Sequence, residues 1–260
     1  MRMSTDFVRS PWRTEGYDPH ATGFRQRWLS RLDDPELMDG DGYSADELRT
    51  NFRDIQRVNR WFGGTSTILT ALSELIPPGA TKISLLDLAT GVADIPLAVQ
   101  RWCDGRGYEA EIMATDVSPQ ILALAKAEVA GSTRIHLQQT DARALPFEND
   151  AFDIVTCSLA LHHFAPADAA QVLREMDRVC RTGFIVNDLR RGVVGYGATW
   201  LASRLTTRNR LTRHDAPLSI KRAYTPAELR ALLDDADVQN VSIKTLPWFR
   251  MVAVKRAAND

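Results

Sequence analysis

The sequence predicts an α/β fold in which helices cover both faces of a mostly parallel sheet. Between residues 83 and 190, short apolar runs typical of buried strands alternate with segments of helical periodicity. Strands joined by such crossover helices run parallel. Near the end of the chain, the apolar runs 241–243 and 251–254 are close enough for an antiparallel hairpin. We therefore expect a doubly wound, seven-stranded sheet that ends in this hairpin.

Residues 1–64 are predicted to form a helical lid that precedes the sheet. Ser44 and Glu47 have the spacing of a capping box, and apolar residues recur at helical intervals from Leu48 onward. Gly63 and Gly64 end this helix, and a second helix is expected over 66–76. Upstream, aromatic residues are mixed with loop-forming prolines and glycines, so this part is expected to pack on the core without regular structure.

The core is predicted to span residues 65–260, with an insertion at about 190–222 on the substrate side. Strands are expected at 83–89, 111–116, 135–139, 152–158 and 184–187, and helices between them at 95–102, 119–129 and 167–179. After the insertion, Thr225, Pro226 and Glu228 carry the signature of another helix start.

Composition narrows the function classes. The formal net charge is −1, from 32 basic and 33 acidic residues, which gives no basic footprint for nucleic acid. Three cysteines, far apart in sequence, favour reduced thiols. No segment has the length and apolarity of a membrane span, and the first residues lack a signal peptide. We expect a cytoplasmic protein, either monomer or homodimer, with a small-molecule partner.

The loop after the first strand is the first candidate for ligand binding, because parallel sheets bind ligands beyond the carboxyl ends of their strands. Gly91 allows the backbone to approach a ligand closely. A dinucleotide fingerprint would place three glycines where this chain has Ala89, Gly91 and Asp94. A carboxylate at the third position repels a pyrophosphate but suits a cation. S-adenosylmethionine carries a sulfonium and an ammonium group, so the loop favours it.

Two further acids follow the next two strands. Asp116 ends the second strand and is placed to accept hydrogen bonds from ribose hydroxyls, in NAD as well as in S-adenosylmethionine. Asp141, after the third strand, is placed to accept one from an adenine amino group. Each acid is alternatively a turn or helix cap. Three of them after consecutive strands favour a binding site.

The ordered set of motifs resembles the class I methyltransferases, which have a Rossmann-like fold. Leu85 to Gly91 resembles their first motif, Asp116 their ribose-binding acid, and 141–147 with 152–155 their adenine and fourth-strand motifs. The segment 161–164 is similar to the branch of quinone-biosynthesis methylases. The resemblance implies S-adenosylmethionine as cofactor. The residues it implies as contacts are Asp87, Ala89, Thr90, Gly91, Asp94, Asp116, Val117, Asp141, Ala142 and Ser158.

Two departures from the family pattern stand out. Ala89 and Ala93 replace the first and last glycines of the usual loop, and their methyl groups are expected to alter the loop or weaken cofactor binding. Residues 180–183, Cys-Arg-Thr-Gly, replace the turn Lys-Pro-Gly-Gly before strand five.

The candidates for proton removal from an acceptor are His162, His163 and Asp188, which follow strands four and five. Each histidine is alternatively a structural residue, and neighbouring side chains are expected to diverge, so that only one serves the site. A metal site at this pair is not expected, because no carboxylate nearby completes a familiar ligand pattern.

The substrate is expected between residues 1–62 and the insertion. Its candidate contacts are His163, Arg191 and His214, although an ion pair explains Arg191 equally well and a turn is the favoured explanation of His214. Four tryptophans are placed to line an apolar pocket or to serve as ordinary packing residues: Trp12, Trp28, Trp61 and Trp200.

The predicted function is methyl transfer from S-adenosylmethionine to a small molecule such as a quinone, a polyketide or another secondary metabolite. Methylation of oxygen or carbon is favoured. The alternatives are a non-catalytic binding protein of the same fold, for which the two loop alanines leave room, and a nicotinamide-dependent oxidoreductase. The loop acid Asp94 argues against the second.

Overall fold

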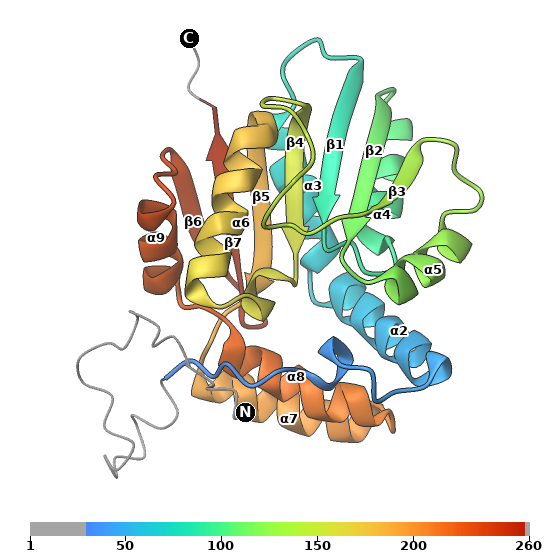
Figure 1. Ribbon diagram of the computed structural model, residues 1–260, viewed down its shortest axis with the longest axis vertical. Coiled ribbons are helices and arrows are strands. Elements are labelled where there is room, and N and C mark those ends of the chain that lie inside the picture. Colours follow the sequence, from blue (N-terminus) through green and yellow to red (C-terminus); the bar gives the residue numbers. More distant parts are fainter. Residues whose placement is uncertain (1–29, 258–260) are drawn as a thin grey trace, which may run out of the picture.

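A computed structural model describes residues 30–257. Its seven strands form one sheet in the order β3-β2-β1-β4-β5-β7-β6 (Figure 1). The strands are β1 (Lys82–Leu88), β2 (Glu109–Asp116), β3 (Ile135–Gln139), β4 (Phe152–Ser158), β5 (Cys180–Leu189), β6 (Val241–Leu246) and β7 (Arg250–Arg256). The first five are parallel, and β7 runs antiparallel to both β5 and β6. The predicted α/β sheet and its terminal hairpin are confirmed.

Helices cover both faces of the sheet (Figure 1). On one face lie α3 (Gly64–Leu75), α4 (Asp94–Asp104) and α5 (Pro119–Glu128), which bury Leu72, Val99 and Ala125 in one apolar cluster. On the other face, α6 (Pro166–Val179) and α9 (Pro226–Asp235) bury Leu173 and Leu233 in a second cluster. Because β1 and β4 are covered on both sides, their apolar centres are fully buried, with Leu85 and Leu86 in β1 and Ile154 and Val155 in β4.

Local capping signals determine where the helices begin. The Ser44 side chain accepts a hydrogen bond from the Glu47 N–H, and the Glu47 carboxylate accepts one from the Ser44 N–H. This capping box starts α2 (Ala45–Trp61), and Thr225 with Glu228 starts α9 in the same way. Ser118 caps α5. These starts match the sequence-based prediction.

The interpretation of residues 180–183 as a turn is wrong. Helix α6 ends at Val179 and passes directly into β5, where Cys180 pairs with Phe152. Gly183 pairs with Ile154 on one side and with Arg256 on the other. Pairing with β7, distant in sequence, extends the strand beyond its apolar centre.

The insertion forms two helices, α7 (Val193–Thr206) and α8 (Arg210–Arg222). Together with α2 and the short helix η1 (Leu37–Asp39), they lie beyond the carboxyl ends of the parallel strands (Figure 1). We call these four elements the roof. The Asn209 side chain donates to the Glu47 carbonyl at 2.7 Å, and the Leu37 N–H donates to Asp215 at 2.8 Å. These hydrogen bonds join the N-terminal elements α2 and η1 to helix α8 of the insertion and its cap residue Asn209.

Across residues 30–257, no helix is long and apolar enough to cross a membrane. The boundary placed between residues 64 and 65 stays a prediction.

Candidate functional site

The loop between β1 and α4 bends through three residues in the left-handed region. The φ angles are 50° at Ala89, 57° at Gly91 and 62° at Ala93. Glycine adopts this conformation freely, whereas an alanine pays about 1–2 kcal/mol for it. The chain thus keeps a glycine-type bend with alanine at two positions. The Phe52 ring of α2 lies directly over Gly91, 3.0 Å from where a Cβ would stand.

Two buried carboxylates, Asp87 and Asp116, lie near the ends of β1 and β2. Asp87 accepts a hydrogen bond from the Thr156 hydroxyl at 2.6 Å. Asp116 accepts one from the Gly91 N–H at 3.1 Å and one from the Ser118 N–H at 3.0 Å. Asp116 therefore ties the loop after β1 to the loop after β2.

A third carboxylate, Asp94, opens α4 and accepts a hydrogen bond from Asn59 at 3.2 Å. Burial is the largest influence on the pKa of Asp87, and the charges of Asp94 and Asp116 add to it. Together they outweigh the Thr156 hydrogen bond and raise this pKa to about 7. Burial also raises the pKa values of Asp94 and Asp116. Three acids gathered around one bend repel one another, and a bound cation would relieve this repulsion.

The end of β3 lies at the same edge, because the Thr140 N–H donates to the Asp116 carbonyl at 3.0 Å. Asp141 follows, but its half-exposed carboxylate is paired with Arg143 at 2.7 Å. Ala142 is buried in the core, and the Val117 side chain is exposed. A ligand amino group at Asp141 must therefore share the carboxylate with Arg143.

The ends of β4 and β5 complete the edge. Asn187 donates to the Ser158 hydroxyl at 3.0 Å. Asp188, fully buried, accepts from the His162 backbone N–H at 3.0 Å and lies 2.7 Å from the Nδ1 of the same histidine. The structure thus brings together two of the residues predicted for proton removal.

The two histidines lie side by side, contrary to the expectation that they diverge. They occupy a short helical turn, η2 (Leu161–His163), and their ring centroids are 4.4 Å apart. His163 Nδ1 lies 2.9 Å from Asp39, and both rings approach Glu36. The tight turn, unlike a strand, places consecutive side chains on one side. Sequence reasoning missed Glu36 and Asp39, because nothing near them in the chain indicates a histidine partner.

The charge of the histidine pair follows from its neighbours. Burial alone would lower the pKa of His162, but Asp188 and then Glu36 outweigh it and raise the pKa to about 10. Burial would raise the pKa of Asp39, but His163 outweighs it and the pKa falls to about 2. The same balance lowers the pKa of Glu36. The pair is therefore surrounded by ionised carboxylates.

Two arginines that the sequence did not single out fix this turn. Arg31 donates to the carbonyls of His162 and Phe164 at 2.9 and 2.7 Å. Arg222 donates to the His163 carbonyl at 2.7 Å and pairs with Asp39 at 3.0 Å. The backbone of the histidine pair is thus held by Arg31, which precedes η1, and by Arg222 at the end of α8.

The predicted substrate residues Arg191 and His214 lie apart from this turn's contacts. Arg191 is buried, donates to the Ala223 carbonyl at 2.7 Å and pairs with Glu228, so it anchors the start of α9. His214 lies 2.8 Å from Asp215 and, with Trp200, lines a cavity of about 380 Å³ between α7, α8 and residues 32–35.

Of the other predicted pocket tryptophans, Trp61 does not line that cavity. Trp61 is largely exposed. Trp12 and Trp28 lie outside the described residues.

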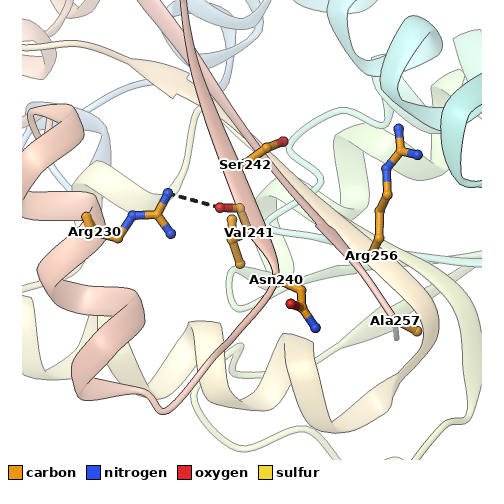
Figure 2. Close-up of a pocket in the computed structure, with 6 residues that line it drawn as sticks. All are labelled: Arg230, Asn240, Val241, Ser242, Arg256 and Ala257. Atoms are coloured by element: carbon orange, nitrogen blue, oxygen red, sulfur yellow. Dashed lines mark hydrogen bonds between the residues drawn. The ribbon is translucent and has the colours of Figure 1, made fainter. Parts of the chain in front are cut away.

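A second depression lies near the start of β5, at the other end of the parallel strands from the three acids. Figure 2 shows its lining, where Arg230 of α9 donates to the Val241 carbonyl at 2.9 Å. Arg256, also in the lining, pairs with Gly183 at the start of β5. This depression is therefore at the end of the strands away from the three acids.

Residues 85–183 match the family model "Methyltransferase domain". The chain is 39% identical over 101 residues to a demethylmenaquinone methyltransferase of Thermus thermophilus, covering 38% of this chain and 43% of that protein. It is 34% identical over 102 residues to a ubiquinone/menaquinone biosynthesis C-methyltransferase of Xylella fastidiosa, covering 38% of each. The match thus spans about two fifths of these curated relatives.

Solved structures share the fold more widely. A methyltransferase from Aquifex aeolicus, described as S-adenosylmethionine-dependent, aligns with a TM-score of 0.56 at 14% identity, over 82% of this chain and 97% of that one. Human N-acetylserotonin methyltransferase aligns with a TM-score of 0.57 at 19% identity, over 83% and 57%. The family implies S-adenosylmethionine as its cofactor. Strand order and sequence match agree, and residues 85–183 carry a methyltransferase domain.

Proposed function

We propose that this protein transfers a methyl group from S-adenosylmethionine to a small-molecule acceptor. The observation that carries the proposal is the set of buried carboxylates Asp87, Asp94 and Asp116 around the Gly91 bend. This set suits a ligand that is cationic and also presents hydroxyl donors. A nicotinamide dinucleotide is disfavoured, because its pyrophosphate would meet Asp94 at the start of α4.

Among the described residues, several buried polar atoms near the same edge lack a hydrogen-bond partner, and they would suit the polar groups of the cofactor. Within residues 30–257, Thr140 Oγ1 and Asn187 Oδ1 are buried without a hydrogen-bond partner, and so is Arg250 Nη1. Arg250 donates to Asn59 at 3.1 Å, and Asn59 donates in turn to Asp94. Buried polar atoms normally have partners, so these atoms point to a bound polar molecule.

Each group of the cofactor then has a residue that would hold it. The carboxyl groups of Asp87 and Asp94 would hold the ammonium, and Arg250 the carboxylate. Asp116 would hold the ribose hydroxyls, while Val117, Asp141 and Ala142 would border the adenine.

The chain's residues then have to align, exclude water and handle a proton. When bound, S-adenosylmethionine supplies an electrophilic methyl group on a sulfonium. Phe52 of α2 covers the loop at Gly91 and would help to exclude water from it. We propose that His163 takes the proton of the acceptor, while His162, held as an imidazolium beside Asp188, positions the pair.

For the acceptor, we propose a quinol, a polyketide or a related secondary metabolite, methylated on oxygen or carbon. Support comes from the quinone-biosynthesis names of the relatives and from the cavity beside Trp200, whose size fits a small molecule. The near-zero net charge gives no support for nucleic acid. We propose a protein without a membrane span, in the cytoplasm.

The test combines binding and turnover. Isothermal titration with S-adenosylmethionine and, separately, with NADH should give binding for the first alone. Incubation with methyl-labelled cofactor and a panel of quinols, resorcinols and amines should then label a hydroxyl or ring carbon. Binding without transfer to any compound would favour the non-catalytic alternative, and binding of NADH alone would overturn the proposal.

Cofactor affinity should depend on pH through Asp87. Its pKa of about 7 means that the carboxyl is mostly neutral at pH 6, and a cationic ligand favours the ionised form. We expect the affinity for S-adenosylmethionine to rise about fivefold from pH 6 to 7, as the ionised fraction does. Titration calorimetry across this range measures it, and Asp87→Asn should bind weakly with a flat profile. A wild-type profile as flat as that of the variant would contradict the prediction.

The raised pKa of Asp87 also makes the stability of the folded protein depend on pH. The pKa of Asp87 is higher in the folded protein than its ordinary value of 3.8, so the folded state holds the extra proton. Asp87 therefore lowers the free energy of unfolding progressively as the pH rises from about 4 to about 7.

A further inference from the structure

Glu36, His162 and His163 converge on one point from two distant parts of the chain. We call them the His–Glu cluster. The His162 Nε2 lies 3.5 Å from one carboxylate oxygen of Glu36, and the His163 Nε2 lies 3.8 Å from the other. One ligand atom from each residue lies within 4.8 Å of the other two. Ligands around a tetrahedral zinc ion are about 3.3 Å apart, so these three atoms would have to move closer by up to about 1.5 Å to coordinate one ion.

Both imidazole rings are oriented as metal ligands are. Each Nδ1 faces a carboxylate, Asp188 at 2.7 Å and Asp39 at 2.9 Å. A carboxylate only accepts hydrogen bonds, so each Nδ1 carries a proton and donates it. The Nε2 atoms face Glu36, and they become ligands when an ion displaces the proton that His162 carries there. Metal-binding histidines are typically fixed by such a carboxylate on the other ring nitrogen.

The cluster is built before any ion arrives. Arg31 and Arg222 hold the carbonyl groups of the histidine turn, and Ser219 donates to Glu36 Oε1 at 2.7 Å. The side chains of Glu36 and His162 are 2% and 3% exposed, whereas that of His163 is 23% exposed. An ion therefore has a path past His163 to a site that is otherwise enclosed.

We propose that Glu36, His162 and His163 bind one divalent transition-metal ion, with Zn²⁺ the best match to two imidazoles and one carboxylate. Three protein ligands leave a coordination position open. In the proposed methyltransferase, that position would receive the acceptor's hydroxyl oxygen and make its proton easier to release to solvent. This release would replace proton transfer to a histidine, because both Nε2 atoms would then be ligands. This second part rests on the proposed function, whereas metal binding itself does not.

The competing occupant is a proton. A His162 imidazolium between Asp188 and Glu36 would satisfy the same carboxylates without an ion. Metal binding and protonation make different predictions for a titration with metal alone.

The experiment uses the full-length protein without an affinity tag, stripped with a chelator and titrated with Zn²⁺ in a calorimeter and with Co²⁺ in a spectrophotometer. We expect one ion per chain and the visible absorption of low-symmetry Co²⁺ bound to imidazole. His163→Ala should weaken Zn²⁺ binding by at least 100-fold. Asp39→Asn removes only a positioning group and should weaken it by about 10–100-fold.

His136→Ala is the matched control. His136 is an exposed histidine 3.2 Å from Glu111. It lies in β3, the outermost strand at one side of the sheet, away from the cluster. This variant should bind Zn²⁺ as the wild type does. No stoichiometric binding to the wild type, or equal binding by His163→Ala, would overturn the proposal and leave the proton as occupant. Should His163→Ala misfold by circular dichroism, the wild-type Co²⁺ spectrum decides alone. Because no cofactor or acceptor is present, failure here leaves the proposed methyl transfer standing.

Discussion

Asp116→Asn should lower the affinity for S-adenosylmethionine about 100-fold, because two charge-assisted hydrogen bonds to the ribose are worth about 3 kcal/mol together. Asp116 is 6% exposed and already accepts the N–H groups of Gly91 and Ser118. Each of its oxygens retains a lone pair for a ligand hydroxyl. The asparagine keeps the size of the side chain but loses its charge and one acceptor oxygen.

Titration calorimetry at pH 7.5 measures this loss, with two variants for comparison. Glu111→Gln changes an exposed acid of the same strand, and it should bind as the wild type does. Asp141→Asn should lose at most about tenfold, because Arg143 already engages that carboxylate. An Asp116→Asn protein that is folded and binds within threefold of wild type would remove Asp116 from the cofactor site.

Gly183→Ala should destabilise the protein by about 3 kcal/mol, the scale of the larger single-residue effects. The added Cβ would stand 2.2 Å from the Lys255 carbonyl oxygen, and real Cβ atoms do not approach so closely. The obstructing atom belongs to the backbone of β7, so no side-chain rotation relieves the contact. β5 and β7 must separate, and they carry Asp188 and Arg250 at their other ends.

Chemical denaturation measured by circular dichroism provides the free energy of unfolding. Gly197→Ala is the matched control, since it lies inside α7 with open space around it. Alanine favours a helix over glycine, so this variant should be stabilised by about 0.5–1 kcal/mol. Equal stability of Gly183→Ala and wild type would mean that the sheet tolerates a shift at this pairing.

The elements that the sequence predicts well depend on local interactions. Ser44 and Thr225 mark helix starts because their partners lie three residues away. Strands β3 and β4 match their predicted bounds, since β3 alternates apolar and polar residues from Ile135 and β4 is centred on the apolar pair Ile154 and Val155. Residues 180–183 show the limit of this reasoning. They resemble a turn locally, but pairing with β4 and β7 makes them part of a strand.

The acids at the strand ends were predictable because strand order along the chain and the parallel direction together place Asp87, Asp116 and Asp141 at one edge. What the sequence left open is which of them are already engaged. Arg143 occupies Asp141, and Arg191, predicted to contact a substrate, instead pairs with Glu228. Such choices depend on side-chain positions that periodicity does not encode.

The sequence by itself determined the alternation of strands and helices, the glycine-type bend and the three acids. These follow from the period of apolar residues and from short-range capping and turn chemistry. Only the tertiary structure decided that Glu36 meets the two histidines and that Arg250 lies beside Asn59 and Asp94. The reason is physical: these contacts join segments far apart in the chain, and the packing of the roof against the sheet alone sets their distance.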